Sequence, residues 1–180
     1  MEGHGSRMKQ DNRGISFVEL MIVVAIMSII IGITGFGINM ISGKAADECA
    51  HKITYSMQNS RTKAMGKFSL EYILYRDSDN LIKIKEIIQN GPTDTAVETV
   101  ATVGDKDVTV VYKLSDGSEW TISGSTVLRI EFDRSSGGFA PVLIDPVSGT
   151  AKYCEEIKVS KASTVRTITL VPPTGKITMN

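Results

Sequence analysis

The hydrophobic pattern of the chain begins with a polar leader and a long apolar run. Residues 1–14 are polar, and Glu19 is the only charged side chain within residues 15–41. From Leu20 to Ile41 no charge occurs, and a helix of that length spans about 33 Å, enough to cross a hydrocarbon core of about 30 Å. The pattern therefore predicts a transmembrane helix over residues 15–41, preceded by a short leader.

After residue 41 the apolar positions follow a helical period. Apolar side chains recur at steps of three and four residues, while charged and polar side chains fill the other faces, which is typical of an amphipathic helix. The apolar positions are Ala46, Cys49, Ala50, Ile53, Met57, Ala64 and Met65. Gly66 and Lys67 resemble a helix stop, so residues 42–67 are predicted to continue the helix into a globular part.

Beyond residue 67 the pattern changes to alternation, which predicts β-strands separated by turns. One hairpin is predicted around Asp77–Asn80 and another around Asp116–Gly117, and Gly91–Asp94 is predicted as a loop. The remaining predicted strands are Val127–Phe132, Phe139–Ile144, Tyr153–Val159, Val165–Val171 and Lys176–Thr178. The expected fold class is α+β, with a long N-terminal helix packed on an antiparallel sheet or small β-sandwich formed by residues 68–180.

The leader places a small residue before the apolar run. An ordinary secretory signal is cut after its apolar region, and no small-residue site of that kind is evident here. Cutting after Gly14 would instead remove a leader with three basic and two acidic residues and leave the apolar helix on the product. It would also create an ammonium at Ile15, one helical turn from Glu19. That ammonium, in the same or a neighbouring chain, could neutralise an acid that is costly near lipid.

These residues resemble a known family. The stretch Arg13-Gly14-Ile15-Ser-Phe-Val-Glu19-Leu-Met-Ile-Val-Val-Ala-Ile26 is similar to the class III signal of type IV prepilins and type II secretion pseudopilins. The resemblance covers about the first quarter of the chain, and it implies a pilin-like fold. One departure is Ile15, because the first mature residue of the family is more often Phe, Met or Leu.

The resemblance implies a function, partners and a location. A prepilin peptidase would cleave between Gly14 and Ile15 and methylate the new amine, and Glu19 would dock the subunit during filament assembly. The other expected partners are pilin or pseudopilin subunits, an inner-membrane assembly platform and the lipid bilayer. The protein would be a non-enzymatic structural subunit of a type IV pilus or of a secretion or competence pseudopilus. It would lie in the bacterial cell membrane as a single-pass protein with its head outside, and then in a filament.

Gly32, Gly35 and Gly37 fall within six residues of the apolar run. Each glycine costs roughly 1 kcal/mol relative to alanine inside a helix, so this stretch is a weak point. Small residues also let neighbouring helices pack closely in membranes. The glycines are therefore compatible with close packing and with a helix-melting site used when the subunit leaves the bilayer.

The closing strands carry a narrower resemblance. Leu128–Phe132 followed by Gly137-Gly138, and Arg166–Leu170 followed by Thr174–Ile177, are similar to the end of minor pseudopilin H and FimT-type domains. This resemblance favours a minor subunit over the pilin of a surface pilus. An alternative function on the same stem is an adhesion or DNA- or ligand-binding module, with Trp120 or the Gly137-Gly138 loop as its contact surface.

Neither catalytic chemistry nor a cofactor is indicated by the sequence. The histidines and cysteines have no zinc-like spacing, and no phosphate-binding loop or nucleophile elbow occurs. The formal net charge is zero, so no basic excess indicates nucleic-acid binding. Asp77, Asp79 and Asn80 are compatible with hydrated turn residues, or with calcium ligands as in a related pseudopilin class.

Cys49 and Cys154 are the two cysteines. An exported pair can form a disulfide, and many members of the wider family carry one at other positions. Cys49 lies on the apolar side of the predicted helix. Cys154 has the opposite parity to Tyr153 and Ile157, which argues against a shared core position. A bridge and two separate thiols both stay open.

Overall fold

The computed structural model describes residues 16–65, 69–89, 95–144 and 150–180, and side chains within these ranges except those of 32–42 and 143–144. The chain divides into two compact units, Met1–Ile38 and Asn39–Asn180. We call the second unit the head. The helix α1 (Phe17–Met65) contributes to both units. The strands are β1 (Ser69–Arg76), β2 (Ile82–Gln89), β3 (Val97–Gly104), β4 (Thr109–Leu114), β5 (Glu119–Thr121), β6 (Leu128–Glu131), β7 (Leu143–Ile144), β8 (Ala151–Lys152), β9 (Cys154–Lys161), β10 (Thr164–Val171) and β11 (Lys176–Met179).

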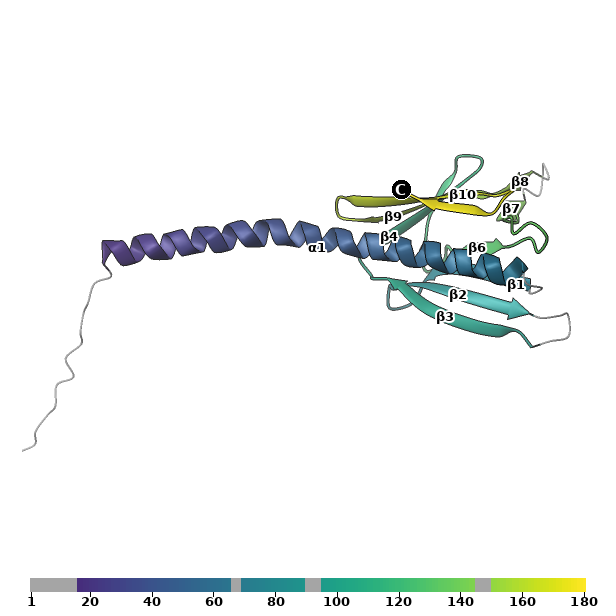
Figure 1. Cartoon of the computed structure of the whole chain (residues 1–180), viewed down its shortest axis with the longest axis horizontal. Helices are drawn as coiled ribbons and strands as arrows, with labels where there is room; N and C mark the ends of the chain where they lie inside the picture. Colours follow the sequence, from purple (N-terminus) through teal and green to yellow (C-terminus); the bar gives the residue numbers. More distant parts are fainter. Residues whose placement is uncertain (1–15, 66–68, 90–94, 145–149) are drawn as a thin grey trace, which may run out of the picture. The chain divides into compact units, whose positions relative to one another are not determined.

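The head contains two larger antiparallel sheets and a two-stranded one. The first has the order β3-β2-β1-β6, the second β11-β10-β9-β4-β5, and the third pairs β7 with β8. Figure 1 shows the part of α1 in the head between β9 and β10 on one side and β2 and β3 on the other. The α+β class with antiparallel sheets is therefore confirmed.

Both predicted hairpins are present. β1 pairs with β2 across the turn at 77–81, with Arg76 opposite Ile82. β4 pairs with β5, with Lys113 opposite Glu119, and Gly117 adopts a φ of 84° in the turn between them. In the first turn Asn80 adopts a φ of 62°. Glycine and asparagine accept positive φ more readily than other residues, so the turn residues in the sequence favour both connections. The predicted Gly91–Asp94 loop lies outside the described residues.

Strand β3 is absent from the sequence-based expectation. Its residues 97–102 are all exposed, on both faces of the sheet. A strand at the edge of a sheet with two solvated faces has no alternation of buried and exposed positions, and alternation is the signal by which strands are read from sequence.

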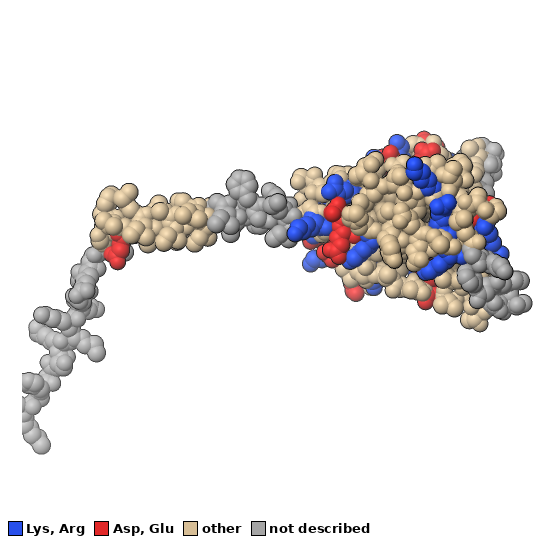
Figure 2. Space-filling model, viewed as in Figure 1, with Lys and Arg blue, Asp and Glu red and all other residues tan. Residues whose placement is uncertain are grey.

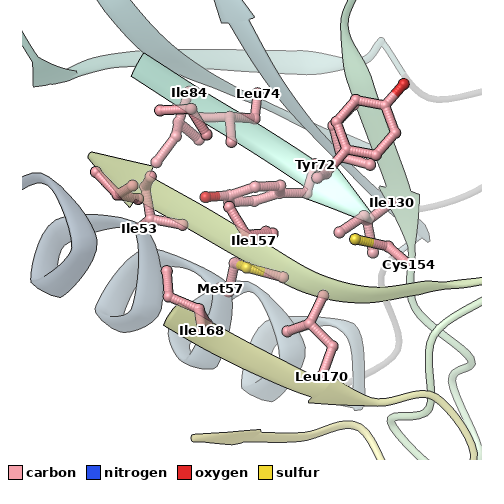
Figure 3. Close-up of a cluster of buried hydrophobic side chains, with 14 of the residues drawn as sticks. Ile53, Met57, Tyr72, Leu74, Ile84, Ile130, Cys154, Ile157, Ile168 and Leu170 are labelled. Atoms are coloured by element: carbon pink, nitrogen blue, oxygen red, sulfur yellow. The ribbon is translucent and has the colours of Figure 1, made fainter. Parts of the chain in front are cut away.

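A single core joins the head part of α1 to both larger sheets. Ile53 and Met57 of α1 lie in one cluster with side chains of β1, β2 and β6 from the first sheet and of β9 and β10 from the second (Figure 3). The predicted apolar face of the helix is buried, with Ala46, Cys49, Ala50, Ile53, Met57 and Ala64 each 0% exposed. Met65 is a correction, since it is 50% exposed at the end of the helix.

Cys154 lies in this core, contrary to the expectation from alternation. Lys113 pairs with Glu156 and Leu114 pairs with Cys154, so Glu155 is an extra residue in a β-bulge. A bulge reverses the parity of the residues that follow it. Cys154 and Ile157, three residues apart, are consequently both buried.

Candidate processing and assembly site

Glu19 lies in the first turn of α1 and caps its own helix. The backbone N–H of Ser16 donates to Oε2 of Glu19 at 3.2 Å, and the N–H of Leu20 donates to the carbonyl of Ser16 at 3.1 Å. This is the returning half of a capping box, in which an acid at the third helical position accepts from the N-cap amide. The Ser-x-x-Glu spacing of Ser16 and Glu19 is the sequence signal for this cap, which the predicted docking role of Glu19 does not include.

The helix that follows Glu19 is apolar on every side. Large side chains between Phe17 and Ile31 are at least half exposed, including Phe17 at 75% and Ile31 at 68%. The hydroxyl of Ser28 donates to the carbonyl of Val24 at 2.7 Å, so this polar side chain is satisfied within the helix. Figure 2 shows acidic atoms at the start of this segment, and Glu19 is the acidic residue in the first turn of α1. Contiguous apolar surface of this kind marks a site that another molecule covers.

Within the described part of the chain, no helix combines the length and hydropathy of a membrane-crossing segment. The span predicted for residues 15–41 is not confirmed. The backbone is helical through Gly32, Gly35 and Gly37.

The first residues of the site have no described position. Gly14 and Ile15 lie outside the described residues, so the structure does not place the bond predicted to be cut or the amine it would release. The described part of the site is the helix start at Ser16, the carboxylate of Glu19 and the exposed apolar segment after it.

The sequence around this helix start matches a known family motif. Residues 9–35 match the prokaryotic N-terminal methylation motif. This motif is type IV prepilin-like, and the match includes Gly14, Ile15 and Glu19. It does not reach the closing strands, so the resemblance to minor pseudopilin H and FimT-type domains stays a prediction. Comparison with curated proteins and comparison with solved structures each gave no match.

The two cysteines are free and buried, and neither carries the features of a reactive thiol. Burial raises the pKa of Cys49 to about 12 and that of Cys154 to about 12. A thiol with so high a pKa is protonated at neutral pH and is a poor nucleophile. Both cysteines are free thiols in this structure, and a disulfide between them stays a prediction.

The turn acids considered for calcium have protein partners. The carboxylate of Asp77 forms an ion pair with Lys83 and accepts the N–H of Asp79 at 2.7 Å. The Lys83 hydrogen bond is the main reason that the pKa of Asp77 falls to about 2. No group of three or more His, Cys, Asp or Glu side chains in the described ranges is arranged to hold a metal ion.

Both predicted contact surfaces lie beside pockets in the head. Trp120 is 49% exposed and lines a pocket of about 360 Å³ whose other walls include Tyr112, Val127 and Arg129. Gly138 lines a separate pocket of about 500 Å³ with Phe139, Tyr153 and two acidic residues. The structure does not bring Trp120 and Gly138 into one site.

Glu86 is a buried charged residue of the head that the sequence-based predictions do not include. It occupies an inward position of β2, in the series Ile82, Ile84, Glu86, and it is 7% exposed. An acid in an alternating apolar series is a signal that could have found it, since a buried carboxylate needs partners. Those partners lie on α1 and are described below.

Proposed function

We propose that the protein is a structural subunit of a type IV pilus or of a secretion or competence pseudopilus, made as a precursor and assembled through its N-terminal helix. The observation that carries this proposal is the methylation motif over residues 9–35, with Glu19 in the first turn of the helix that the motif opens. Processing would separate Gly14 from Ile15 and leave a methylated amine at Ile15. The head would then lie outside the membrane.

The geometry at Glu19 supports a docking role alongside capping. The capping bond to Ser16 uses one carboxylate oxygen, Oε2. An ionised carboxylate has about four acceptor positions on two oxygens, so Glu19 keeps acceptor capacity for an ammonium. An incoming subunit could cap its own helix and also pair with the Ile15 amine of a neighbour. In a low-dielectric surrounding that pairing is much stronger than in water.

The exposed apolar segment explains why the pairing is needed. Lipid or neighbouring helices would cover the side chains between Phe17 and Ile31, but a uniformly apolar surface does not select one axial position. A charge pair at the end of the helix does, because its energy is most favourable at contact and weakens as the two charges separate. Glu19 would therefore set the register of one subunit against the next. Gly32, Gly35 and Gly37 would allow close packing or local melting as the subunit moves.

Cleavage is tested by co-expression with a prepilin peptidase. Intact mass or N-terminal sequencing should show a product that begins at Ile15, and Gly14→Glu should block its formation because the peptidase site needs a small residue. A product that still begins at Met1 in the unaltered chain would contradict the proposed processing.

Docking is tested with two variants that separate charge from capping. Glu19→Val removes both, whereas Glu19→Gln keeps an oxygen that can accept the Ser16 N–H and removes only the charge. In a sheared-filament assay with the assembly machine present, both variants should insert into membranes and neither should enter filaments. If Glu19→Gln assembles as well as the unaltered chain, helix capping rather than charge pairing is what assembly requires.

A second candidate function is a binding module displayed on the same helix. The observation in its favour is the half-exposed indole of Trp120 in the wall of an apolar pocket, since pockets of this size and lining often bind ligands. Adding DNA or a host ligand to the full chain and following Trp120 fluorescence tests this function. Saturable quenching would support it. Because Trp120→Ala removes the only tryptophan and with it the signal, that variant is titrated by calorimetry instead, and it should no longer bind.

A further inference from the structure

The buried carboxylate of Glu86 joins β2 to three residues of α1. The hydroxyl of Ser60 donates to Oε1 of Glu86 at 2.5 Å, and the hydroxyl of Ser56 lies 3.4 Å from the same oxygen. The ammonium of Lys63 donates to Oε2 at 2.8 Å. We call these four residues the Glu86 clasp. Its members on α1 are spaced four and three residues apart, so they form one stripe along two turns of the helix.

The clasp is the buried charged contact between the helix and the first sheet. The side chain of Glu86 is 9% exposed and that of Lys63 is 36% exposed, while Ser60 is completely buried. Among the described residues, other polar links also hold α1 in the head. Asp47 pairs with Arg166 at 2.6 Å, with both side chains about 40% exposed, and Arg61 donates to backbone carbonyls. Screening by solvent weakens the exposed pair more than the buried one.

The apolar face of α1 is a poor determinant of its axial position. Its inward side chains include Ala46, Ala50 and Ala64, which form shallow ridges, and only Ile53 and Met57 are large. A slip of one turn, about 5.4 Å, would exchange one small side chain for another at several of these positions. A slip in one direction would place Ala64 where Ser60 now donates to Glu86. A slip in the other direction would place Asn59 where Lys63 now donates, so either slip would cost the carboxylate one of its two shortest contacts.

We propose that Glu86 is a positioning residue, which fixes the axial and rotational register of α1 in the head and so fixes the surface that the head offers to another subunit. Buried polar groups that select one register are the best-attested use of such contacts. The surface combines exposed side chains of α1, such as Tyr55 at 73%, with exposed strands, such as β3. This inference rests on the proposed function, because a subunit that packs repeatedly against its neighbours needs one fixed surface.

The test replaces the charged half of the clasp with apolar residues of similar size. In Glu86→Leu with Lys63→Met, no charge is left buried without its partner, and such exchanges are often neutral or stabilising. The matched control is Glu98→Gln with Lys85→Met. It removes an ion pair of 2.7 Å between β2 and β3 that does not involve α1. All variants are studied as the full chain in detergent micelles.

The register is read from the distance between two spin labels. Gln58→Cys on α1 and Thr99→Cys on β3 place labels at exposed sites, and Thr99 lies opposite Glu86 in the strand pairing. The native thiols of Cys49 and Cys154 are buried and should stay unlabelled. We expect one narrow distance distribution in the parent chain, the control and Glu86→Gln, whose amide oxygen can still accept from Ser60. The apolar double variant should keep its melting temperature and show a broadened or divided distribution, with displacements of about one helical turn, 5.4 Å.

Filament yield is then measured for the same set with the assembly machine, and the apolar double variant should fall several-fold while the control does not. A narrow single distance in the apolar variant would overturn the proposal, whether or not its melting temperature falls, because a purely structural contact would change stability and not register. If the unaltered chain itself fails to assemble, the proposed function fails, whereas the spin-label distances still decide the role of Glu86.

Discussion

Replacing Gly175 with alanine should destabilise the head much more than the same replacement at Gly117. Both glycines have positive φ, 64° and 84°, so an alanine at either position meets the same kind of backbone strain. The surroundings differ. A Cβ at Gly117 would meet no atom within 4 Å, whereas a Cβ at Gly175 would overlap the backbone carbonyl of Gly137. That carbonyl is held in place because it accepts from Nε of Arg61 at 3.0 Å.

The expected free energies follow from these contacts. Alanine in the left-handed region lowers the free energy of unfolding by about 1–2 kcal/mol. The reduced entropy of the unfolded chain offsets about 0.4–1 kcal/mol of this, so Gly117→Ala should lower the free energy of unfolding by about 1 kcal/mol. Gly175→Ala adds about 1–3 kcal/mol for overpacking and about 1 kcal/mol for a weakened bond between Arg61 and Gly137. Its total should therefore be about 3–5 kcal/mol.

The measurement is urea unfolding of the full chain in detergent, followed by the fluorescence of Trp120, the only tryptophan. Gly124→Ala is the neutral control, because no atom lies within 4 Å of its Cβ and its φ is not in the positive range. If Gly175→Ala costs no more than Gly117→Ala, the close approach of the two loops does not constrain the head, and the reasoning from the Gly137 carbonyl is refuted.

Three further predictions concern single residues of the head. Ala162 has a φ of 52°, so Ala162→Gly should raise the free energy of unfolding by about 0.5–1 kcal/mol in the same titration, and a loss of stability would contradict the strain. The hydrogen bond with Lys83 is the main reason that the pKa of Asp77 is lowered from its ordinary value of 3.8 to about 2. The ionised carboxylate therefore contributes its full stability above pH 3.8, and that stability is lost as the pH falls through 2. The melting temperatures of the parent chain and Asp77→Asn should therefore differ at pH 7 and converge towards pH 2, and a constant difference would exclude this cause. Cys49 and Cys154, each with a pKa of about 12, should react with a thiol reagent at pH 8 only as fast as the head unfolds, and rapid labelling of either would show that it is not buried.

The sequence by itself determined the features that depend on local order along the chain. A helical period in residues 42–65 identified the buried face of α1, because side chains three and four residues apart lie on one side of a helix. Asp77–Asn80 and Asp116–Gly117 identified two hairpins, because their backbone conformations need particular residues. The methylation motif was readable for the same reason, since its glycine, its acid and the apolar run stand at fixed distances from one another.

Only the tertiary structure decided which individual residues are buried although the local pattern predicts otherwise. Cys154 is buried because a bulge opposite Lys113 and Leu114 reverses its parity, and the bulge depends on a strand far away in the sequence. Glu86 can occupy a core position because Ser60, 26 residues earlier, donates to its carboxylate. The periodic spacing of apolar residues along the chain predicts which side chains lie on the same face of a helix or strand. Whether a polar side chain can be buried on that face depends on partners that only folding brings within hydrogen-bond distance.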